Sequence, residues 1–426
     1  MKLIKNYVFL LLSIALLLSC SRDDSSYSEG TGKLTFSYIG VNTEVISTIT
    51  PSRISSSEES KPIDDYVKNG FSLNVFTHTE PVMVYQCTDY EEYKAGKCEE
   101  VELRSGSYDL ITVLGNYELE GFELPCYSDT LRKVAIKNGE ETSVTFNCKL
   151  SNSLLKINYT DKFMEYFSTY SSSVSTSLGN KVDYTMEEVR SAYLAPGEVT
   201  VYVTAKKEGA KEATFNVGTY KLSARYEYAL TLDVDAYKRT MTISFSENIE
   251  DAAPITIDVS DAALNAAAPK ITPTEGFKSG EKVEIIEGEI VDNPYAVTIN
   301  AEGLIQNCVL TTKSDYLIKN GWSVNESGLG TIDLITASAD DINKVKALGL
   351  EFKGIGENAQ MAYVDFTNLI RNIPTGNEIE INLNVTDKYN KVSPNNPFVV
   401  KATTTSCGFE VSGLQMNVHS WEMSVK

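Results

Sequence analysis

The sequence predicts an all-β protein built from tandem antiparallel β-sandwiches. Apolar and polar residues alternate along many short segments, which is the period of a strand with one buried face. In residues 226–234 one side of the expected strand carries only apolar or aromatic residues: Tyr226, Tyr228, Leu230, Leu232 and Val234. The composition agrees, because 24 Tyr accompany only two Trp and two His, and aromatic residues favour strands. Short strands between Gly, Asn and Pro turns are typical of sandwiches.

The N-terminus predicts a secretory signal peptide over residues 1–19. Lys2 and Lys5 precede an apolar run over residues 8–18. As a helix this run would extend only about 17 Å, too short for a ~30 Å hydrocarbon core. A charged start followed by a short apolar run is typical of export signals.

The apolar run ends at Ser19-Cys20, which resembles the lipobox of bacterial lipoproteins. Leu18 departs from the residue that is usual at its position. The resemblance implies cleavage between Ser19 and Cys20 and lipidation of the Cys20 thiol, with acyl chains such as palmitate holding the protein on a membrane. The alternative is an ordinary signal peptide that is cut nearby.

Residues 20–32 are polar, acidic and rich in Ser and Gly, which predicts a flexible tether. Ser21, Asp23 and Asp24 resemble the signal that sends lipoproteins of Bacteroidetes to the outer face of the outer membrane, although Arg22 interrupts it. We therefore expect a lipid-anchored outer-membrane protein that faces the cell exterior. The alternative is a solvated leader that carries no address.

The charge excludes one class of partner. The formal net charge is -20, and it becomes -22 when Lys2 and Lys5 leave with the signal peptide. So acidic a chain should repel nucleic acid. With 426 residues, two or three domains of ordinary size are expected.

The order of strands, turns and composition shifts predicts the domain organisation after the tether. Residues 101–115 and 192–206 repeat one order of Leu, Gly and strand, which indicates two sandwiches with a similar strand order. A chance likeness of two β-domains is an equally weighted alternative. An Ala- and Pro-rich stretch follows. The pattern after it predicts a third unit, which we interpret as an immunoglobulin-like domain. The expected bounds are 33–150 for β-sandwich 1, 151–235 for β-sandwich 2, 236–276 for a connector with one or two strands, 277–406 for the immunoglobulin-like domain and 407–426 for terminal strands.

Helical signals are few. Ser338 and Asp341 form a capping box that opens one short helix in the third unit, and residues 364–370 hold one more turn. A second capping box, from Thr185 to Glu188, stands before a brief turn.

Six cysteines remain after lipidation of Cys20: Cys87, Cys98, Cys126, Cys148, Cys308 and Cys407. An even number in an exported protein permits three disulfides, with fifteen connectivities. Cys87 and Cys98 flank a polar stretch that resembles a hairpin tip, so we expect a disulfide between them. Cys148 shares a face with apolar neighbours and is expected to be a buried thiol in the core.

No catalytic motif stands out, and we predict a protein that is not an enzyme, with no cofactor and no metal site. His78 and His419 lie in different expected domains, and we expect a strand-end residue and a packing or surface residue, respectively. Asp233 and Asp235 occupy alternate positions of one strand before a turn. A glycosidase needs only two carboxylates, so an enzyme stays the least favoured alternative. Thr130, in Asp-Thr-Leu, resembles an O-glycosylation site of Bacteroidetes surface proteins.

The succession of these pieces from residue 32 to 234 resembles a family of Bacteroidetes surface lipoproteins of unknown function, similar in layout to fimbrillins and their anchor subunits. The third unit resembles the immunoglobulin-like module carried after them, with residues 364–376 and the segment VTDKYNK (385–391) as its most telling residues. The resemblance implies two fimbrillin-like sandwiches, a disulfide-permissive location and an adhesin-like or pilus-associated role in cell adhesion. It supplies no catalytic residue.

The expected partners are the membrane, through the N-terminal lipid, and pilus subunits, surface proteins of host or bacterium, or glycans. The alternative function is a surface glycan-binding lipoprotein of a polysaccharide uptake system. The apolar stretch after Cys407 completes the third domain, begins a further domain, or is lent to a neighbouring subunit.

Overall fold

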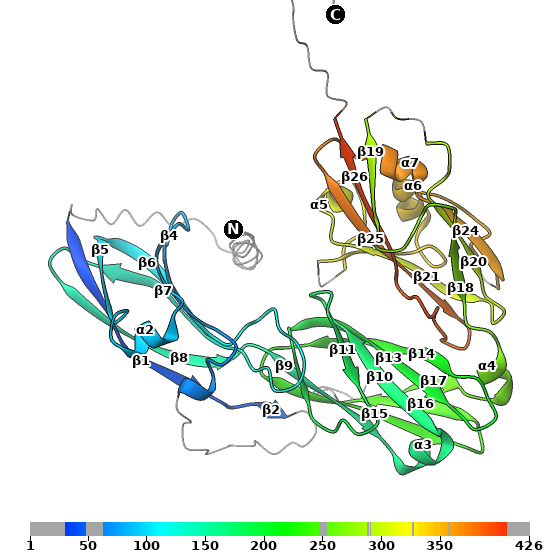
Figure 1. The fold of residues 1–426 in the computed structure, drawn as a ribbon, viewed down its shortest axis with the longest axis horizontal. Helices are drawn as coiled ribbons and strands as arrows, with labels where there is room; N and C mark the ends of the chain where they lie inside the picture. Colours follow the sequence, from blue (N-terminus) through cyan, green and yellow to red (C-terminus); the bar gives the residue numbers. More distant parts are fainter. Residues whose placement is uncertain are drawn as a thin grey trace, which may run out of the picture. The chain divides into compact units, whose positions relative to one another are not determined.

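The computed structural model describes residues 30–47, 63–246, 254–287, 289, 291–325, 328–356 and 358–406. The expectations for Ser19, Cys20, Cys407, His419 and the terminal strands lie outside these residues. The described chain is mostly strand, so the all-β fold class is confirmed (Figure 1). It folds into two compact units: the first holds residues 30–42, 63–115 and 127–149, and the second holds the rest.

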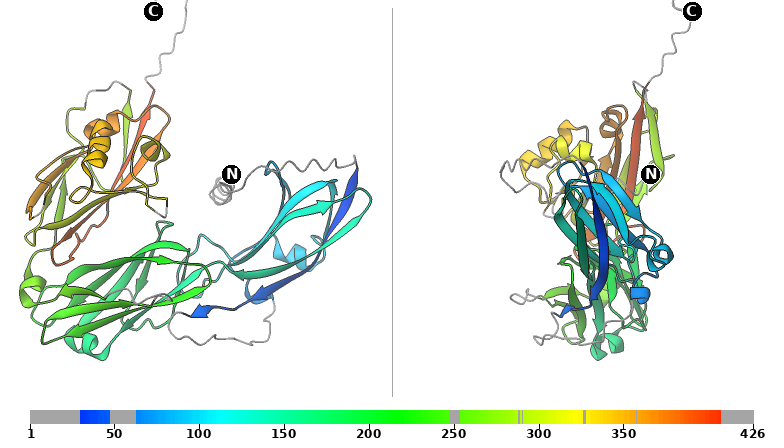
Figure 2. Two further views of the ribbon diagram at one scale, coloured as in Figure 1. Left: turned by 180° about the vertical axis from the view of Figure 1, so that it is seen from behind. Right: turned by 90° about the vertical axis from the view of Figure 1, so that its left-hand side faces the viewer.

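The first unit is one seven-stranded sheet in the order β4-β3-β6-β7-β8-β1-β5. Its elements are β1 (Thr31–Asn42), η1 (Ile63–Asp65), β3 (Phe71–Thr77), β4 (Met83–Cys87), α2 (Tyr90–Lys94), β5 (Glu100–Arg104), β6 (Gly106–Leu114), β7 (Tyr127–Ile136) and β8 (Glu141–Leu150). The sheet curls over its own core (Figure 2). The ring of Phe36 on β1 stacks 5.9 Å from that of Tyr85 on β4. Alternate residues such as Leu34 and Phe36 are buried, as the sequence predicts.

Cys87 and Cys98 form a disulfide, with their Cα atoms 6.3 Å apart. The expected hairpin tip between them is wrong, because β4 and β5 are the two opposite edges of the sheet. Asp89 instead caps α2, where its carboxylate accepts from the backbone amides of Glu91 and Glu92. The bond therefore joins the two ends of the curled sheet.

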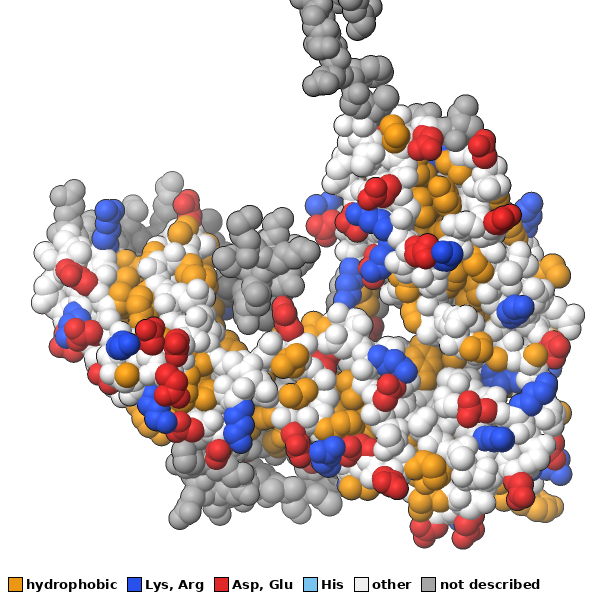
Figure 3. Space-filling model, viewed as in Figure 1, with side chains coloured by type: hydrophobic (Ala, Val, Ile, Leu, Met, Phe, Trp, Pro, Cys, Tyr) orange, Lys and Arg blue, Asp and Glu red, His pale blue; other side chains and the backbone are white. Residues whose placement is uncertain are grey.

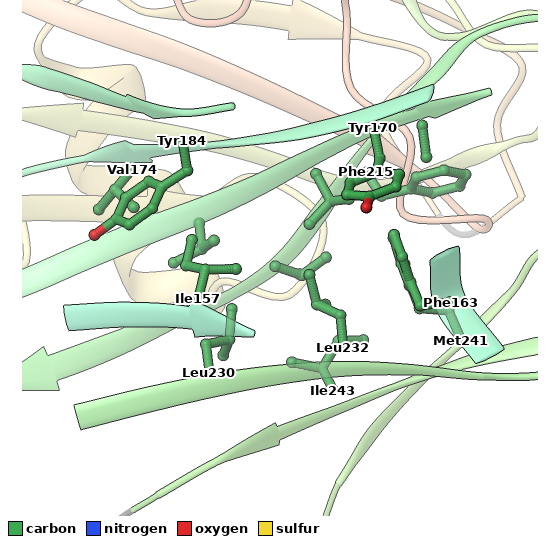
Figure 4. Close-up of a cluster of buried hydrophobic side chains, with 14 of the residues drawn as sticks. Ile157, Phe163, Tyr170, Val174, Tyr184, Phe215, Leu230, Leu232, Met241 and Ile243 are labelled. Carbon is green, nitrogen blue, oxygen red and sulfur yellow. The ribbon is translucent and has the colours of Figure 1, made fainter. Parts of the chain in front are cut away.

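The second unit begins with the middle sandwich, whose two sheets run β11-β10-β13-β14 and β12-β9-β15-β16-β17, with β2 beside β15. Its elements are β2 (Ile46–Ser47), β9 (Ser153–Tyr159), α3 (Asp161–Tyr166), β10 (Thr169–Ser175), β11 (Lys181–Tyr184), β12 (Ala192–Leu194), β13 (Gly197–Lys206), β14 (Ala213–Leu222), β15 (Tyr226–Asp235), β16 (Thr240–Phe245), β17 (Ile255–Asp258) and α4 (Asp261–Asn265). Side chains of both sheets interdigitate in its core, as Figure 4 shows for Tyr184 and Phe215 against Leu230 and Ile243.

The strand orders of the first unit and the middle sandwich correspond. The paths β4-β3-β6-β7 and β8-β1-β5 match β11-β10-β13-β14 and β15-β9-β12. The internal repeat expected from residues 101–115 and 192–206 is therefore confirmed. The connector expected at residues 236–276 is wrong over most of its length, because β16 and β17 pair onto β15 and extend the middle sandwich. Its Ala- and Pro-rich composition does not indicate strands, because these strands are stabilised by pairing with the rest of the sheet rather than by local sequence preference.

The C-terminal sandwich packs the sheet β18-β20-β24-β23 against β19-β26-β25-β21-β22. Its elements are β18 (Lys270–Pro273), β19 (Lys282–Ile286), β20 (Ala296–Asn300), β21 (Ile305–Thr312), α5 (Asp315–Lys319), β22 (Gly330–Asp333), α6 (Ala339–Ala347), β23 (Glu351–Lys353), β24 (Met361–Asp365), α7 (Thr367–Arg371), β25 (Glu378–Asp387) and β26 (Phe398–Thr405). The helix after Ser338 is confirmed, since the Ser338 hydroxyl accepts from the amide of Asp341. Helix α7 confirms the turn expected at residues 364–370, and α5 is a further short helix that the sequence analysis did not predict.

The disulfide yields the first prediction. Replacing Cys87 and Cys98 together by Ser should lower the free energy of unfolding by about 2–4 kcal/mol, because the bond restricts the unfolded chain. Thermal unfolding with and without dithiothreitol measures this. Reductant should lower the Tm of the wild type and leave that of the double variant unchanged; an equal response of the two proteins would contradict the prediction.

Candidate functional site

A loop surface along the β11 edge of the middle sandwich is the candidate site. It is built from three segments, residues 116–126, 176–180 and 185–191. Four large apolar side chains on these segments are exposed: Leu119 (41%), Leu178 (40%), Met186 (45%) and Val189 (69%). We call these four side chains the apolar loop patch. Exposed apolar groups that are held on a fixed scaffold are typical of interaction surfaces.

Residues 116–126 form the connection between β6 and β7, but they belong to the second unit. Glu120 fixes this segment through three hydrogen bonds. Its carboxylate accepts from the Ala195 amide at 2.8 Å, from the Thr176 hydroxyl at 2.5 Å and from the Asn180 side-chain amide at 2.8 Å. Charge-assisted bonds of this kind are the stronger class, so Glu120 holds Leu119 beside the turn that carries Leu178.

Phe122 anchors the same segment in the core. Its ring meets that of Tyr184 edge to face at 5.1 Å, and the Tyr184 hydroxyl donates to the carbonyl of Leu155. Gly121 exchanges two backbone hydrogen bonds with Tyr193 on β12. Gly121 has φ +140°, a conformation open to glycine, which allows this approach to β12.

Arg190 ties the loop 185–191 to the segment 116–126. Its guanidinium lies 5.1 Å above the Phe122 ring, binds Glu123 at 2.9 Å and forms two bonds to Glu188 at 2.7 and 3.0 Å. The Arg190 hydrogen bonds lower the pKa of Glu188 to about 2. The expected brief turn at Thr185 is present, since the Glu188 amide donates to the Thr185 carbonyl, but no helix follows it, and the Glu188 carboxylate accepts from the Arg190 amide.

The surroundings of the patch are acidic. Glu118, Glu123 and Glu187 are exposed on the same segments. On the face drawn in Figure 3, charged side chains of both signs are spread over the surface with hydrophobic side chains between them. The patch with its acidic surround fits a partner that offers an apolar surface with basic residues around it.

The residues singled out from the sequence lie elsewhere. Thr130 is exposed in the middle of β7 rather than in a loop, and the neighbouring Asp129 accepts from the amides of Thr130 and Asn147. His78 directly follows β3, as expected, with its Nδ1 atom 2.8 Å from Asp109 Oδ1.

Asp233 and Asp235 have structural roles. Asp233 accepts from the Thr160 hydroxyl at 2.5 Å, and Asp235 accepts from the backbone amides of Tyr237 and Lys238 in the turn after β15. Within the described ranges, no three His, Cys, Asp or Glu side chains form a group that could hold a metal ion.

The described cysteines outside the disulfide are buried. Burial raises the pKa of the Cys126 and Cys308 thiols to about 12, which leaves them unreactive at neutral pH. Cys148 is likewise buried in the core of the first unit, as the sequence predicts. In the part of the chain that the structure describes, no helix is both long and apolar enough to cross a membrane.

The curled sheet of the first unit and the middle sandwich share a strand order, and with the C-terminal sandwich they define a tandem all-β protein. The chain belongs to the family described as a domain of unknown function, DUF4493, which matches residues 30–265. The match ends at the last residue of α4, so the family domain comprises the first unit and the middle sandwich.

Several solved structures are similar to parts of the chain. One, described as a candidate adhesin of Bacteroides ovatus, has 10% identity and a TM-score of 0.26, over 55% of this chain and 98% of that one. A second structure, described as candidate polysaccharide-binding proteins of Bacteroides thetaiotaomicron, has 9% identity and a TM-score of 0.30, over 48% of this chain and 95% of that one. The sialic acid-binding region of a Streptococcus sanguinis adhesin has 12% identity and a TM-score of 0.19, over 51% of this chain and 60% of that one. No curated protein matches the chain.

The Arg190 ion pair yields a prediction. Arg190→Ala should raise the pKa of Glu188 from about 2 towards the ordinary range of a glutamate, because the hydrogen bonds that favour the charged form are lost. The pair stabilises the fold above the ordinary pKa of about 4.3, and this contribution disappears as the pH falls towards 2.

An NMR titration of the carboxyl carbons checks this shift. Asp341 is the control, because its pKa is lowered by hydrogen bonds from Ser323 and Ser338, far from Arg190 in the sequence, and should not change. An unaltered Glu188 titration in the variant would show that Arg190 does not set this pKa.

Proposed function

We propose that this protein is a lipoprotein of the outer membrane, attached through Cys20 and facing the cell exterior, that binds another protein in an adhesin-like or pilus-associated role. The apolar loop patch carries the proposal. Its four side chains remain exposed although Glu120, Phe122 and Arg190 hold their backbone in place. A fixed backbone lowers the entropy that must be lost when a partner is bound.

A protein fits the patch better than a sugar does. Leu, Met and Val side chains gain free energy by burial against other apolar side chains, at roughly 25 cal/mol per Å² of apolar surface. They provide neither hydrogen bonds nor an aromatic face for a sugar. The acidic residues on the same segments favour a partner with basic residues around its own apolar surface. No step of this role requires catalysis.

A polar sheet face favours the second candidate, a glycan-binding lipoprotein. Outward positions of β10 and β13 include Ser171, Ser173, Ser175, Thr200 and Thr204. Tyr202 lies on the same face but is contacted by Asn396 of the C-terminal sandwich. Hydroxyl groups of Thr200 and Thr204 bond to those of Thr219 and Thr214 on β14, at 3.0 and 2.9 Å. A face of hydroxyl groups offers donors and acceptors to a polyhydroxylated ligand. Thr130, exposed on β7, remains a proposed O-glycosylation site.

Surface exposure is the first test. Intact cells that carry the wild type or Cys20→Ala are treated with protease, and the protein is detected by immunoblot. We expect the wild type to be degraded and the variant to be protected, because the unlipidated chain has no anchor on the outer face. A wild-type protein that survives while a periplasmic control also stays intact would place the chain inside the envelope, and the adhesin-like role would then be wrong.

The patch is tested by Leu119→Ser with Val189→Ser. Both side chains are exposed, so thermal stability should change by less than about 0.5 kcal/mol. Binding of the purified protein to immobilised extracellular-matrix proteins and to cells of other bacteria should fall by tenfold or more. Thr200→Ala with Thr204→Ala is the matched control on the sheet face. If the control loses binding to polysaccharide gels and the patch variant keeps all its binding, the glycan-binding function replaces the first.

A further inference from the structure

The loop between β25 and β26 lies along the edge of β14 in the middle sandwich. The amide of Asn216 donates to the carbonyl of Asn390 at 2.7 Å, and the amide of Val392 donates to the carbonyl of Thr214 at 3.0 Å. These bonds flank a bridge between Phe215 and Lys391 in antiparallel register. Residues 390–392 thus pair with the sheet β11-β10-β13-β14 at its β14 edge, although they belong to the C-terminal sandwich.

Lys391 carries a buried ammonium group through this contact. Only 1% of its side chain is exposed. Its Nζ atom donates to the carbonyl of Ala263 at 2.7 Å and to that of Ala266. These carbonyls lie in and just after the last turn of α4, where a helix leaves acceptors without internal partners.

Asp387 completes the arrangement from the C-terminal sandwich. Its buried Oδ2 atom lies 4.0 Å from the Lys391 ammonium, and its Oδ1 atom accepts from the amides of Lys391 and Tyr389 at 2.9 Å. Burial lowers the pKa of Lys391 and raises that of Asp387, so both charges are held against a desolvation cost. A buried charge is tolerated only while its partners stay in place.

Further contacts join the same two sandwiches. The side-chain amide of Asn396 donates to the Tyr202 hydroxyl at 3.3 Å, and that of Asn325 donates to Glu198 at 2.9 Å. The Lys313 ammonium donates to the carbonyl of Ser177, in the turn that carries Leu178. Because these contacts lie on several different loops, they oppose rotation of one sandwich relative to the other about any single contact.

We propose that Lys391 locks the C-terminal sandwich onto the β14 edge, so that the middle and C-terminal sandwiches form one rigid body and this edge is closed to strand addition by another chain. An open strand edge is a template for pairing with a second molecule. Residues 390–392 occupy the edge at residues 214–216 of β14 from within the chain. The inference is independent of the proposed binding role, because it concerns only contacts inside the second unit.

Hydrogen exchange of the full chain tests the lock. In Lys391→Met, which keeps most of the side-chain volume, the amides of Asn216 and Val392 should exchange at least about tenfold faster than in the wild type. Amides in the centre of β15 and β25 should keep their protection, which shows that both sandwiches remain folded. Lys388→Met is the matched control: Lys388 is exposed three residues earlier in the same loop, so its replacement should change neither amide.

The double variant Lys391→Met with Asp387→Asn separates the two parts of the lock. It removes both charges but keeps a carbonyl oxygen for the amides of Lys391 and Tyr389. Fast exchange in both the single and the double variant would assign the lock to the bonds from Nζ to Ala263 and Ala266. Recovery in the double variant would assign the loss to an unpaired Asp387 and overturn the role given to Lys391.

Size-exclusion chromatography provides the second readout. Opening of the β14 edge should make Lys391→Met self-associate at concentrations where the wild type and Lys388→Met elute alike. Unchanged exchange at Asn216 and Val392 in Lys391→Met would overturn the lock, whatever its elution. Loss of protection without any change in elution would overturn the claim that the lock closes the edge to other chains.

Discussion

In each of the three domains, an early strand pairs in parallel with a much later strand of the same domain, and this pair closes the domain. β1 pairs with β8, β9 with β15 and β19 with β26, and each of these pairs is parallel. A parallel pair requires a long connection, so most strands between the two members belong to the same domain. The exception is β2, which follows β1 in the chain but pairs with β15 of the middle sandwich. The pairing partners lie far apart in sequence, which makes such domains high in contact order. The other features of the molecule are loops that leave these closed units.

Local pattern predicted individual strands well and their neighbours less well. The alternation in residues 226–234 identified β15, because burial of every second side chain is a local property. The pairing of β16 with β15 depends on the whole sheet, and so residues 236–276 appeared to be a connector. The stretch after Cys87 shows the same limit, since a polar segment between two strands resembles a turn even where Asp89 begins a helix.

The candidate site could not be predicted from the sequence, because residues 116–126 are distant in sequence from residues 176–180 and 185–191 and are joined to them by side-chain contacts. Nothing near Glu120 signals that its carboxylate reaches Thr176, Asn180 and Ala195. Leu119 and Val189 resemble core residues until their exposure is known. The polar face could be predicted from the sequence, because the outward positions of Thr200, Tyr202 and Thr204 follow from the alternation along β13.

The segment VTDKYNK resembles a family module in sequence, and in the structure it contains both members of the buried pair, Asp387 and Lys391. A buried ion pair seldom adds net stability compared with apolar residues of similar volume. Its effect here is geometric, because an ammonium with fixed acceptors in α4 permits one arrangement of the two sandwiches. The Lys313 contact to Ser177 extends this restraint to the turn that carries Leu178. A partner that binds the apolar loop patch would therefore bind a surface that is already ordered by folding, so little further conformational entropy would be lost on binding.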